Sequence, residues 1–147
     1  MIPQLNARGE LPPGIHTATL DEVEVIFANG PKRRTLFEGL KRALENLKAA
    51  GVLRVFIDGS FVTGKTEPND VDGCWEWHED VDLNRLDAVF LDFSHQRQSM
   101  REKYGVDFFI ANWVEASSGK TFLDFFQQNR FFEPKGILVI EFRNAHD

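Results

Sequence analysis

Residues 58–72, D-G-S-F-V-T-G-K-T-E-P-N-D-V-D, decide how the rest of this sequence is interpreted. The stretch predicts the end of a strand, a Gly-Ser turn, a polar loop and a second strand that opens with Asp70 and Asp72. Side chains two positions apart on a strand project from the same face, so the two carboxylates are expected to lie side by side. At about 4 Å and an effective dielectric constant of about 20, two such charges repel each other by roughly 4 kcal/mol. A fold keeps this pair readily when a cation usually sits between them, and Mg²⁺ takes carboxylates together with substrate phosphates as ligands.

The composition predicts one ordinary globular domain. The chain has 147 residues, 42% of them hydrophobic and 27% charged, which is enough for a single domain, 1–147, with a core of its own. A formal charge of −6 argues against a broad basic surface for duplex nucleic acid, although not against a local basic patch. The single cysteine, Cys74, excludes an internal disulfide framework. No leader pattern and no membrane-length apolar run occurs, so we expect a cytoplasmic protein with no membrane partner.

Helical patterns occur at several places, and the best marked covers residues 35–50. Thr35 and Glu38 form a capping-box pattern, apolar residues then recur at helical spacing, and Gly51 supplies a stop signal. Residues 1–14 are punctuated by prolines and predict an irregular arm. Further helices are expected over residues 19–27, over 83–90 after a cap at Asp82, over 94–104 after a cap at Ser94, and over 121–128, where Phe122, Phe125 and Phe126 should be buried.

Four short apolar runs predict strands, at residues 52–57, 71–77, 106–113 and 137–142. Asp107 is an unusual occupant of the third run, because its neighbours are apolar and an unpaired charge there would be costly. More than one helix lies between some of the strands. The order therefore predicts an α/β or α+β fold with a mixed β-sheet flanked by helices, and not a regular βαβ array.

The order of the polar motifs resembles the DNA polymerase β-like nucleotidyltransferase superfamily. A strand ends in Gly59-Ser60, a loop follows, D-x-D stands at Asp70 and Asp72 on the next strand, and Asp107 lies alone on a later strand. Minimal members of that superfamily carry the same elements in the same order. The resemblance implies a nucleotidyltransferase-like fold in which Asp70 and Asp72 hold the nucleotide-bound metal ion and Asp107 helps to activate the acceptor.

A narrower resemblance covers most of the chain. L-P-P-G-I-H at residues 11–16, together with D-G-S-F-V-T-x-K-x-x-P-x-D-V-D, is similar to a small uncharacterised bacterial family within that superfamily. That similarity brings no known substrate, and it extends through G-V-D at residues 105–107, F-L-D-F-F at 122–126 and K-G-I at 135–137.

Three features depart from the superfamily pattern. Thr63 stands where many minimal members have an arginine, and Lys65 offers a positive charge instead. Asp58 occupies a position that is usually apolar, where it either adds to a metal site or caps the turn. The large helical domain of bigger members is missing.

The residue types also fit phosphoryl transfer by their own chemistry, which depends on positioning and charge neutralisation. Three carboxylates on adjacent strands could hold two divalent ions, Mg²⁺ or Mn²⁺, one on the triphosphate and one lowering the pKa of an attacking hydroxyl. Gly59 lets the backbone approach a phosphate, and Ser60 offers it a hydroxyl and an N–H group. Lys135, just before the last strand, is a further candidate for contact with the triphosphate.

Each signal has a structural alternative. A Gly-Ser turn is common after a strand, and Asp107 could be a buried carboxylate satisfied by backbone donors. Cys74 and Glu76 share a face with Asp72 and are weaker candidates for a supporting role. A calcium loop matches Asp70, Asp72, Gly73 and Glu79, but Pro68 would occupy its first ligand position.

The expected function is that of a Mg²⁺-dependent nucleotidyltransferase, which moves a nucleoside monophosphate from an NTP such as ATP to a hydroxyl of RNA or protein. The alternative is a catalytically weak nucleotide-binding or regulatory module that acts with a partner protein, by analogy with toxin–antitoxin pairs of this superfamily. A metal-dependent nuclease that uses the same carboxylates is a third interpretation.

Overall fold

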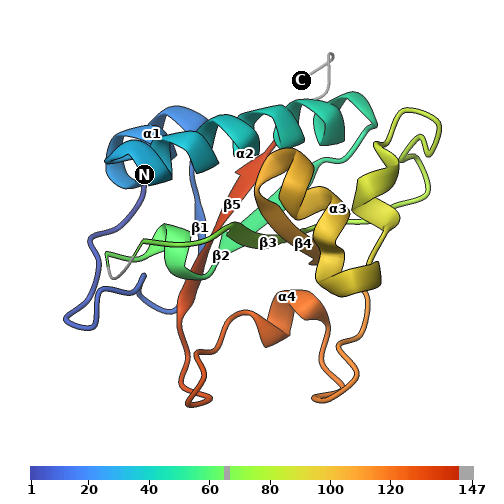
Figure 1. Cartoon of the computed structure of the whole chain (residues 1–147). Helices are drawn as coiled ribbons and strands as arrows, with labels where there is room; N and C mark the ends of the chain where they lie inside the picture. The colour runs from blue at the N-terminus through green and yellow to red at the C-terminus, as the bar shows by residue number, and fades with distance from the viewer. Residues whose placement is uncertain (65–66, 143–147) are drawn as a thin grey trace.

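A five-stranded mixed β-sheet forms the centre of the structure, a computed structural model that describes residues 1–64 and 67–142. In space the strands follow the order β1-β5-β2-β3-β4 (Figure 1). The pairs β1–β5 and β3–β4 are parallel, and β2 runs antiparallel to both of its neighbours. This confirms the predicted class of a mixed sheet with helices. The strands are β1 (Gly14–Thr17), β2 (Arg54–Asp58), β3 (Val71–Trp75), β4 (Val106–Ile110) and β5 (Gly136–Glu141).

Helices cover the sheet unequally. In Figure 1, α1 and α2 lie along the upper side of the sheet and α4 lies on the lower side. None of the helices in the described part of the chain is long and apolar enough to cross a membrane. The helices are α1 (Leu20–Phe27), α2 (Pro31–Ala49), α3 (Ser94–Tyr104) and α4 (Phe122–Phe125), with 3₁₀ turns η1 (Ser60–Val62) and η2 (Ala88–Leu91).

The two faces of the sheet differ in how deeply they are covered. One face packs against α1, α2 and α3 in the main apolar core, to which β2 contributes Val55 and Ile57. The opposite face carries a smaller cluster that includes Phe56 and Cys74, with residues 123 and 126 of the α4 region packed on it. Because side chains alternate along a strand, Asp58 shares this second face with Phe56. Asp58, and the aspartates in register with it on β3 and β4, therefore lie on the face with the smaller cluster.

Helix α2 begins four residues earlier than the sequence pattern predicted. Gly30 has a φ of 89° and Pro31 occupies the first helical position, where its missing N–H costs no hydrogen bond. Thr35 lies inside the helix and its hydroxyl donates to the carbonyl of Pro31 (3.0 Å), so the predicted capping box there is wrong. A capping box is present instead in α1, between Thr19 and Glu22, and α1 lies where it was predicted.

Two other predicted helices are corrected. Residues 83–90 form turns followed by η2, and the Asp82 carboxylate accepts a local bond from the backbone of Asn84 (2.9 Å) and lies 3.6 Å from Nε of Arg85. The predicted helix over 121–128 is reduced to α4, which has four residues. No residue of α4 is fully buried, because a helix this short cannot turn all of its aromatic rings toward the sheet. Phe122, Phe125 and Phe126 are therefore half-buried, and not buried as predicted.

Helix α3 ends as predicted, at Gly105 in the left-handed conformation, but begins unexpectedly. Its first turn contains three consecutive residues with positive φ, 52° to 59°, at positions 95–97. L-residues other than glycine rarely adopt this conformation. The predicted cap is also wrong, because Ser94 lies in the helix and its N–H donates to the Asp92 carboxylate (3.1 Å). Arg97 is the last of these three residues.

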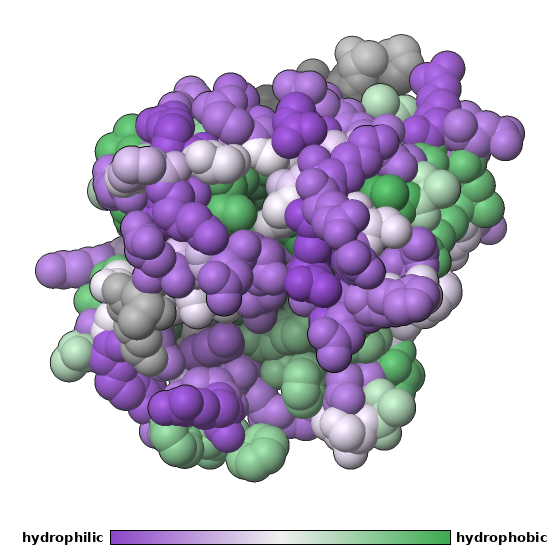
Figure 2. Space-filling view, in the orientation of Figure 1, coloured by the Kyte–Doolittle hydropathy of each residue, from purple (hydrophilic) through white to green (hydrophobic). Residues whose placement is uncertain are grey.

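The surface in the view of Figure 2 is mainly hydrophilic, and its hydrophobic residues are gathered in separate small patches.

Gly39 marks a close contact between α2 and α3 and generates a test of this packing. A Cβ at Gly39 would lie 2.0 Å from the carbonyl oxygen of Tyr104. Gly39→Ala improves helix propensity by about 1 kcal/mol, yet we expect it to lower the free energy of unfolding by about 2 kcal/mol because the two helices must separate. Urea denaturation followed by circular dichroism measures this. Thr35→Ala, an exposed change in the same helix, is the control and should stay within about 0.5 kcal/mol of wild type. An unchanged stability of Gly39→Ala would contradict the contact.

Candidate metal centre

Three aspartates lie in one row across β2, β3 and β4. Asp58, the last residue of β2, is paired in register with Asp72 of β3. Asp72 is in turn paired in register with Asp107 of β4. Asp70 lies just before β3, two positions from Asp72 and therefore on the same side of the sheet. The register of three strands thus brings together carboxylates that are far apart in the sequence.

The distances within this group suit a divalent cation. One carboxylate oxygen from each of Asp70, Asp72 and Asp107 lies within 4.8 Å of the other two. Oxygens on opposite sides of one bound ion are about 4.2 Å apart for Mg²⁺ and about 5 Å apart for Ca²⁺. All three residues are half-buried, so an ion can reach them from solvent. The three metal ligands named from the sequence therefore meet at one place in the structure.

Asp58 adds a fourth carboxylate with an unusual environment. The residue is 5% exposed, and its Oδ1 makes no hydrogen bond with any part of the chain that the structure describes. Burial raises the pKa of Asp58 to about 7, an effect that the Lys135 charge opposes and that Asp107 reinforces. A buried carboxylate oxygen without a donor is costly, and a cation beside it would remove that cost. This observation favours a metal site on its own account.

The pKa of Asp72 is raised as well. Burial raises the pKa of Asp72 to about 8, and the negative charges of Asp58 and Asp70 add to the shift. The repulsion predicted from the D-x-D spacing is therefore present, with Asp58 as an additional source. Without a cation, the carboxylates of Asp58 and Asp72 therefore bind protons more tightly than an ordinary aspartate does.

Gly59 is required by its contact with Asp72. Its φ is 75°, and a Cβ at this position would lie 2.2 Å from Oδ2 of Asp72. Any other residue would therefore push into the carboxylate that the cluster needs. Ser60 follows directly as the first residue of η1, and its side chain is exposed.

Arg33 of α2 holds the bend from behind and was not identified from the sequence. Its guanidinium donates to the carbonyl oxygens of Phe61 (2.7 Å), Ser60 (3.2 Å) and Thr63 (3.0 Å). These bonds fix the backbone that follows Gly59 and connect the bend to the main helix layer. No sequence pattern indicated this role for Arg33, because an arginine near the start of a helix is usually exposed to solvent.

Arg97 is the second residue that sequence reasoning missed. Its Nε donates to Oδ1 of Asp107 (2.8 Å) and its Nη2 donates to Oδ2 (3.0 Å), so the pair is bidentate. The guanidinium also lies 4.7 Å from the ring centroid of Phe109. Hydrogen bonding to Asp107 raises the pKa of Arg97, and Asp70 and Asp72 contribute to the shift. Arg97 thus supplies a positive charge that partly neutralises the cluster. The sequence did contain one indication of such a partner, because a charged Asp107 among apolar strand residues needs an opposite charge.

Lys135 and Lys65 are the other residues that the sequence predicted to contact the nucleotide. Lys135 lines a cavity together with Gly59 and Ser60. Thr63 lines the same cavity, and its hydroxyl donates to the carbonyl of Ser60 (2.9 Å). Lys65 lies outside the residues that the structure describes.

Two weaker candidates have structural roles. Cys74 is fully buried in the small apolar cluster, and burial raises the pKa of its thiol well above the usual value. Glu76 pairs with Arg54 through two hydrogen bonds of 3.2 and 2.5 Å. The calcium-loop alternative is also excluded, because residues 71–75 form strand β3.

Comparison with known families gives one match. A family model described as a family of unknown function, DUF6932, matches residues 3–141. The chain belongs to the DUF6932 family. No curated protein and no solved structure matches the chain. The function of this DUF6932 member therefore has to be argued from its own residues.

The raised carboxylate pKa values predict a pH dependence for the metal-free protein. The folded-state values of about 7 for Asp58 and about 8 for Asp72 lie above the value of about 3.9 in an unfolded chain. The folded state therefore binds protons more tightly, and this contribution to stability is lost as pH rises through the folded-state values. We expect the melting temperature in chelator to fall between about pH 5 and about pH 9.

Asp72→Asn tests the origin of this decline. It should flatten the pH profile and leave the metal-free protein at least as stable as wild type at about pH 8, because a like-charge contact is removed. Asp82→Asn, at an exposed aspartate that pairs with Arg85 and is not part of the cluster, is the control and should keep the wild-type profile. Strong destabilisation of metal-free Asp72→Asn would show that the carboxylate has a structural role instead.

Arg97→Gln tests the counter-charge. It leaves Asp107 without its bidentate partner, so we expect a loss of about 1.5–3 kcal/mol in the free energy of unfolding without metal. Added Mg²⁺ should restore part of this loss, because the cation replaces the missing positive charge. Arg85→Gln, whose side chain is 71% exposed, is the control and should stay within about 0.5 kcal/mol of wild type. If both variants unfold at the same urea concentration, the pair contributes nothing.

Proposed function

We propose that this DUF6932 member is a Mg²⁺-dependent nucleotidyltransferase that moves a nucleoside monophosphate from an NTP to a hydroxyl of RNA or protein. The observation that carries the proposal is the meeting of Asp70, Asp72 and Asp107 within 4.8 Å, beside the Gly59–Ser60 bend. In this reaction an acceptor hydroxyl attacks the α-phosphorus, loses its proton, and displaces pyrophosphate.

The residues of the cluster would hold the metal. Asp70 and Asp72 would bind the ion that carries the triphosphate, and Asp107 would help to bind the ion that activates the acceptor hydroxyl. When bound, divalent ions neutralise the phosphates and lower the pKa of the attacking hydroxyl. Manganese could substitute for magnesium, since both take oxygen ligands.

The chain's own groups position the substrate around these ligands. The N–H and hydroxyl groups of Ser60 would bind the phosphates, and the bonds from Arg33 to the carbonyl oxygens of Phe61 and Ser60 would hold the bend in place when a ligand binds. Phosphoryl transfer gains most of its rate from such positioning and from charge neutralisation.

A second candidate is favoured by the Arg97–Asp107 pair. Both oxygens of Asp107 accept hydrogen bonds from Arg97, which competes with an ion for the third ligand. A protein in which this pair persists would bind nucleotide through Asp70 and Asp72 but transfer it slowly. It would then act as a regulatory module with a partner protein, such as one half of a toxin–antitoxin pair.

A transfer assay separates the two candidates. The purified chain is incubated with Mg²⁺, each of the four α-³²P-labelled NTPs, and either RNA or protein extract from the source cells. We expect label on one class of acceptor. Loss of a residue that only supports a metal ligand typically lowers activity roughly 10–100-fold. Asp72→Asn and Asp107→Asn should each lower the transfer rate by more than that. Glu76→Gln, one residue after β3, is the matched control, because its side chain pairs with Arg54 and is not part of the acidic cluster.

The other outcomes of this assay are equally informative. Nucleotide binding without transfer to any acceptor would support the regulatory module. Cleavage of the RNA without any NTP would identify a nuclease and contradict the proposal. Transfer that survives in Asp72→Asn would place the catalytic site elsewhere.

A further inference from the structure

A cavity of about 530 Å³ opens beside the Gly59–Ser60 bend. Its walls come from the N-terminal arm at residues 8–10, from the bend, and from the loop before β5 at residues 129–135. Small-molecule sites typically have volumes of about 300–1,000 Å³. A larger cavity, of about 600 Å³, lies at the other end of β5 beside α2, away from the bend. The cavity at the bend is lined by Gly59, which packs directly against the carboxylate of Asp72, so it adjoins the cluster.

Positive charges line this cavity next to the acidic row. Arg8, Arg130 and Lys135 all contribute to its walls. Lys135 lines this cavity together with Gly59 and Ser60, the residues that follow Asp58 at the end of β2. Phosphates that extend from the cluster past Ser60 would therefore reach Lys135.

Phe131 supplies an aromatic wall at the loop before β5. Its side chain is 66% exposed, and the guanidinium of Arg130 lies 5.0 Å from its ring centroid. Unstacked nucleobases bind to proteins by stacking on aromatic rings and on arginine planes. Phe132, the next residue, is 77% exposed but does not line the cavity. Phe131 and Phe132 are therefore both exposed phenylalanines, of which Phe131 lines the cavity and Phe132 does not.

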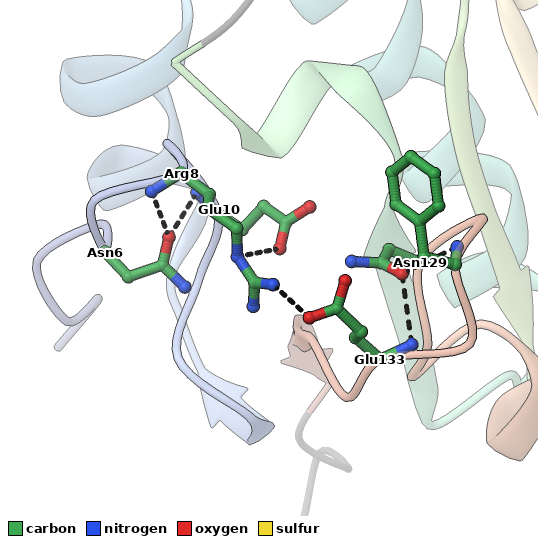
Figure 3. A network of polar contacts seen from close by, with 6 residues as sticks. Asn6, Arg8, Glu10, Asn129 and Glu133 are labelled. Atoms are coloured by element: carbon green, nitrogen blue, oxygen red, sulfur yellow. Dashed lines mark hydrogen bonds and ion pairs between the residues drawn. The ribbon is translucent and has the colours of Figure 1, made fainter.

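A polar network holds the two loops around the cavity (Figure 3). The Arg8 guanidinium donates from Nη1 to Oε2 of Glu133 (2.6 Å), and its Nε lies 3.5 Å from Oε1 of the buried Glu10. On the arm, Oδ1 of Asn6 accepts bonds from the backbone N–H groups of Arg8 (2.9 Å) and Glu10 (3.1 Å). On the other loop, Oδ1 of Asn129 accepts a bond from the backbone of Glu133 (3.1 Å). Segments from opposite ends of the chain are thus ordered before a ligand binds, which lowers the cost of binding.

We propose that this cavity binds the nucleoside part of a nucleoside triphosphate, with the base stacked on Phe131 and the phosphates directed past Lys135 and Ser60 toward the aspartates. The inference rests on the proposed function, because the metal cluster anchors the phosphates. Stacking recognises the face that all bases share, so all four NTPs are expected to bind. Inorganic tripolyphosphate has the phosphates but no base, and it therefore separates the two halves of the site.

Isothermal titration calorimetry of the full chain with Mg²⁺ tests this division. Wild type should bind NTPs about tenfold or more tightly than tripolyphosphate, and Phe131→Ala should weaken NTP binding about tenfold without affecting tripolyphosphate. Phe132→Ala is the matched control and should change neither affinity. Lys135→Gln should lower the affinity for both NTPs and tripolyphosphate. Because Phe131 is exposed, its variant should melt at the wild-type temperature.

Two results would overturn the nucleoside site alone. One is equal affinity of wild type for NTPs and tripolyphosphate, and the other is unchanged NTP affinity in Phe131→Ala. Both leave the metal–phosphate site of the proposed function in place. Absence of Mg²⁺-dependent binding of either ligand would instead overturn the proposed function and this inference together.

Discussion

Electrostatic repulsion among aspartates on one face of the sheet is the constraint on which the site depends. The register places Asp58, Asp72 and Asp107 in adjacent positions on three neighbouring strands, and Asp70 stands beside them. Burial makes the repulsion worse, because a low-dielectric environment disfavours every charge. The raised pKa values of Asp58 and Asp72 favour proton binding, which reduces the repulsion, and the guanidinium of Arg97 supplies a positive charge. A divalent cation would do the same with a larger charge.

The scaffold explains why this arrangement is rigid. The heavily packed face of the sheet, against α1, α2 and α3, fixes the strands and therefore the register. The opposite face is covered by the short α4 region and, at Phe109, by Phe93 and Arg97, and it leaves the metal-ligand candidates half-buried. Gly59 and Arg33 then hold the backbone of the bend at the end of β2, one by its lack of a side chain and the other by its bonds to carbonyl groups. Stability and chemistry are thus divided between the two faces.

Charge and space at this site both support the metal–nucleotide ligand that we propose. The cluster needs positive charge, the adjoining cavity supplies it from Lys135, and an exposed aromatic ring lines the cavity. A metal–nucleotide complex has the cations, the phosphates and the planar base that these features complement. Membership of the DUF6932 family adds no substrate, so the assignment depends on this complementarity.

The sequence by itself determined the elements that depend on local patterns. The strands at the centre of the sheet, helix α1 and the C-terminal end of α3 lie where their apolar spacing, capping residues and glycine predicted. The three metal-ligand candidates were also identified, because the D-x-D spacing and a lone aspartate among apolar residues are visible without a structure. Local patterns failed at residues 83–90 and at the start of α2, where Pro31 acts as a better first residue than Thr35.

Only the tertiary structure decided which charges meet. The pairing of Asp58 with Asp72 depends on the β2–β3 register, and the bond from Arg97 to Asp107 depends on a left-handed turn that no sequence pattern predicts. The cavity likewise needs segments from both ends of the chain, joined by Arg8 and Glu133. The physical reason is the same in each case. Spacing along the chain specifies which face a side chain occupies, whereas its partner across the sheet depends on long-range packing.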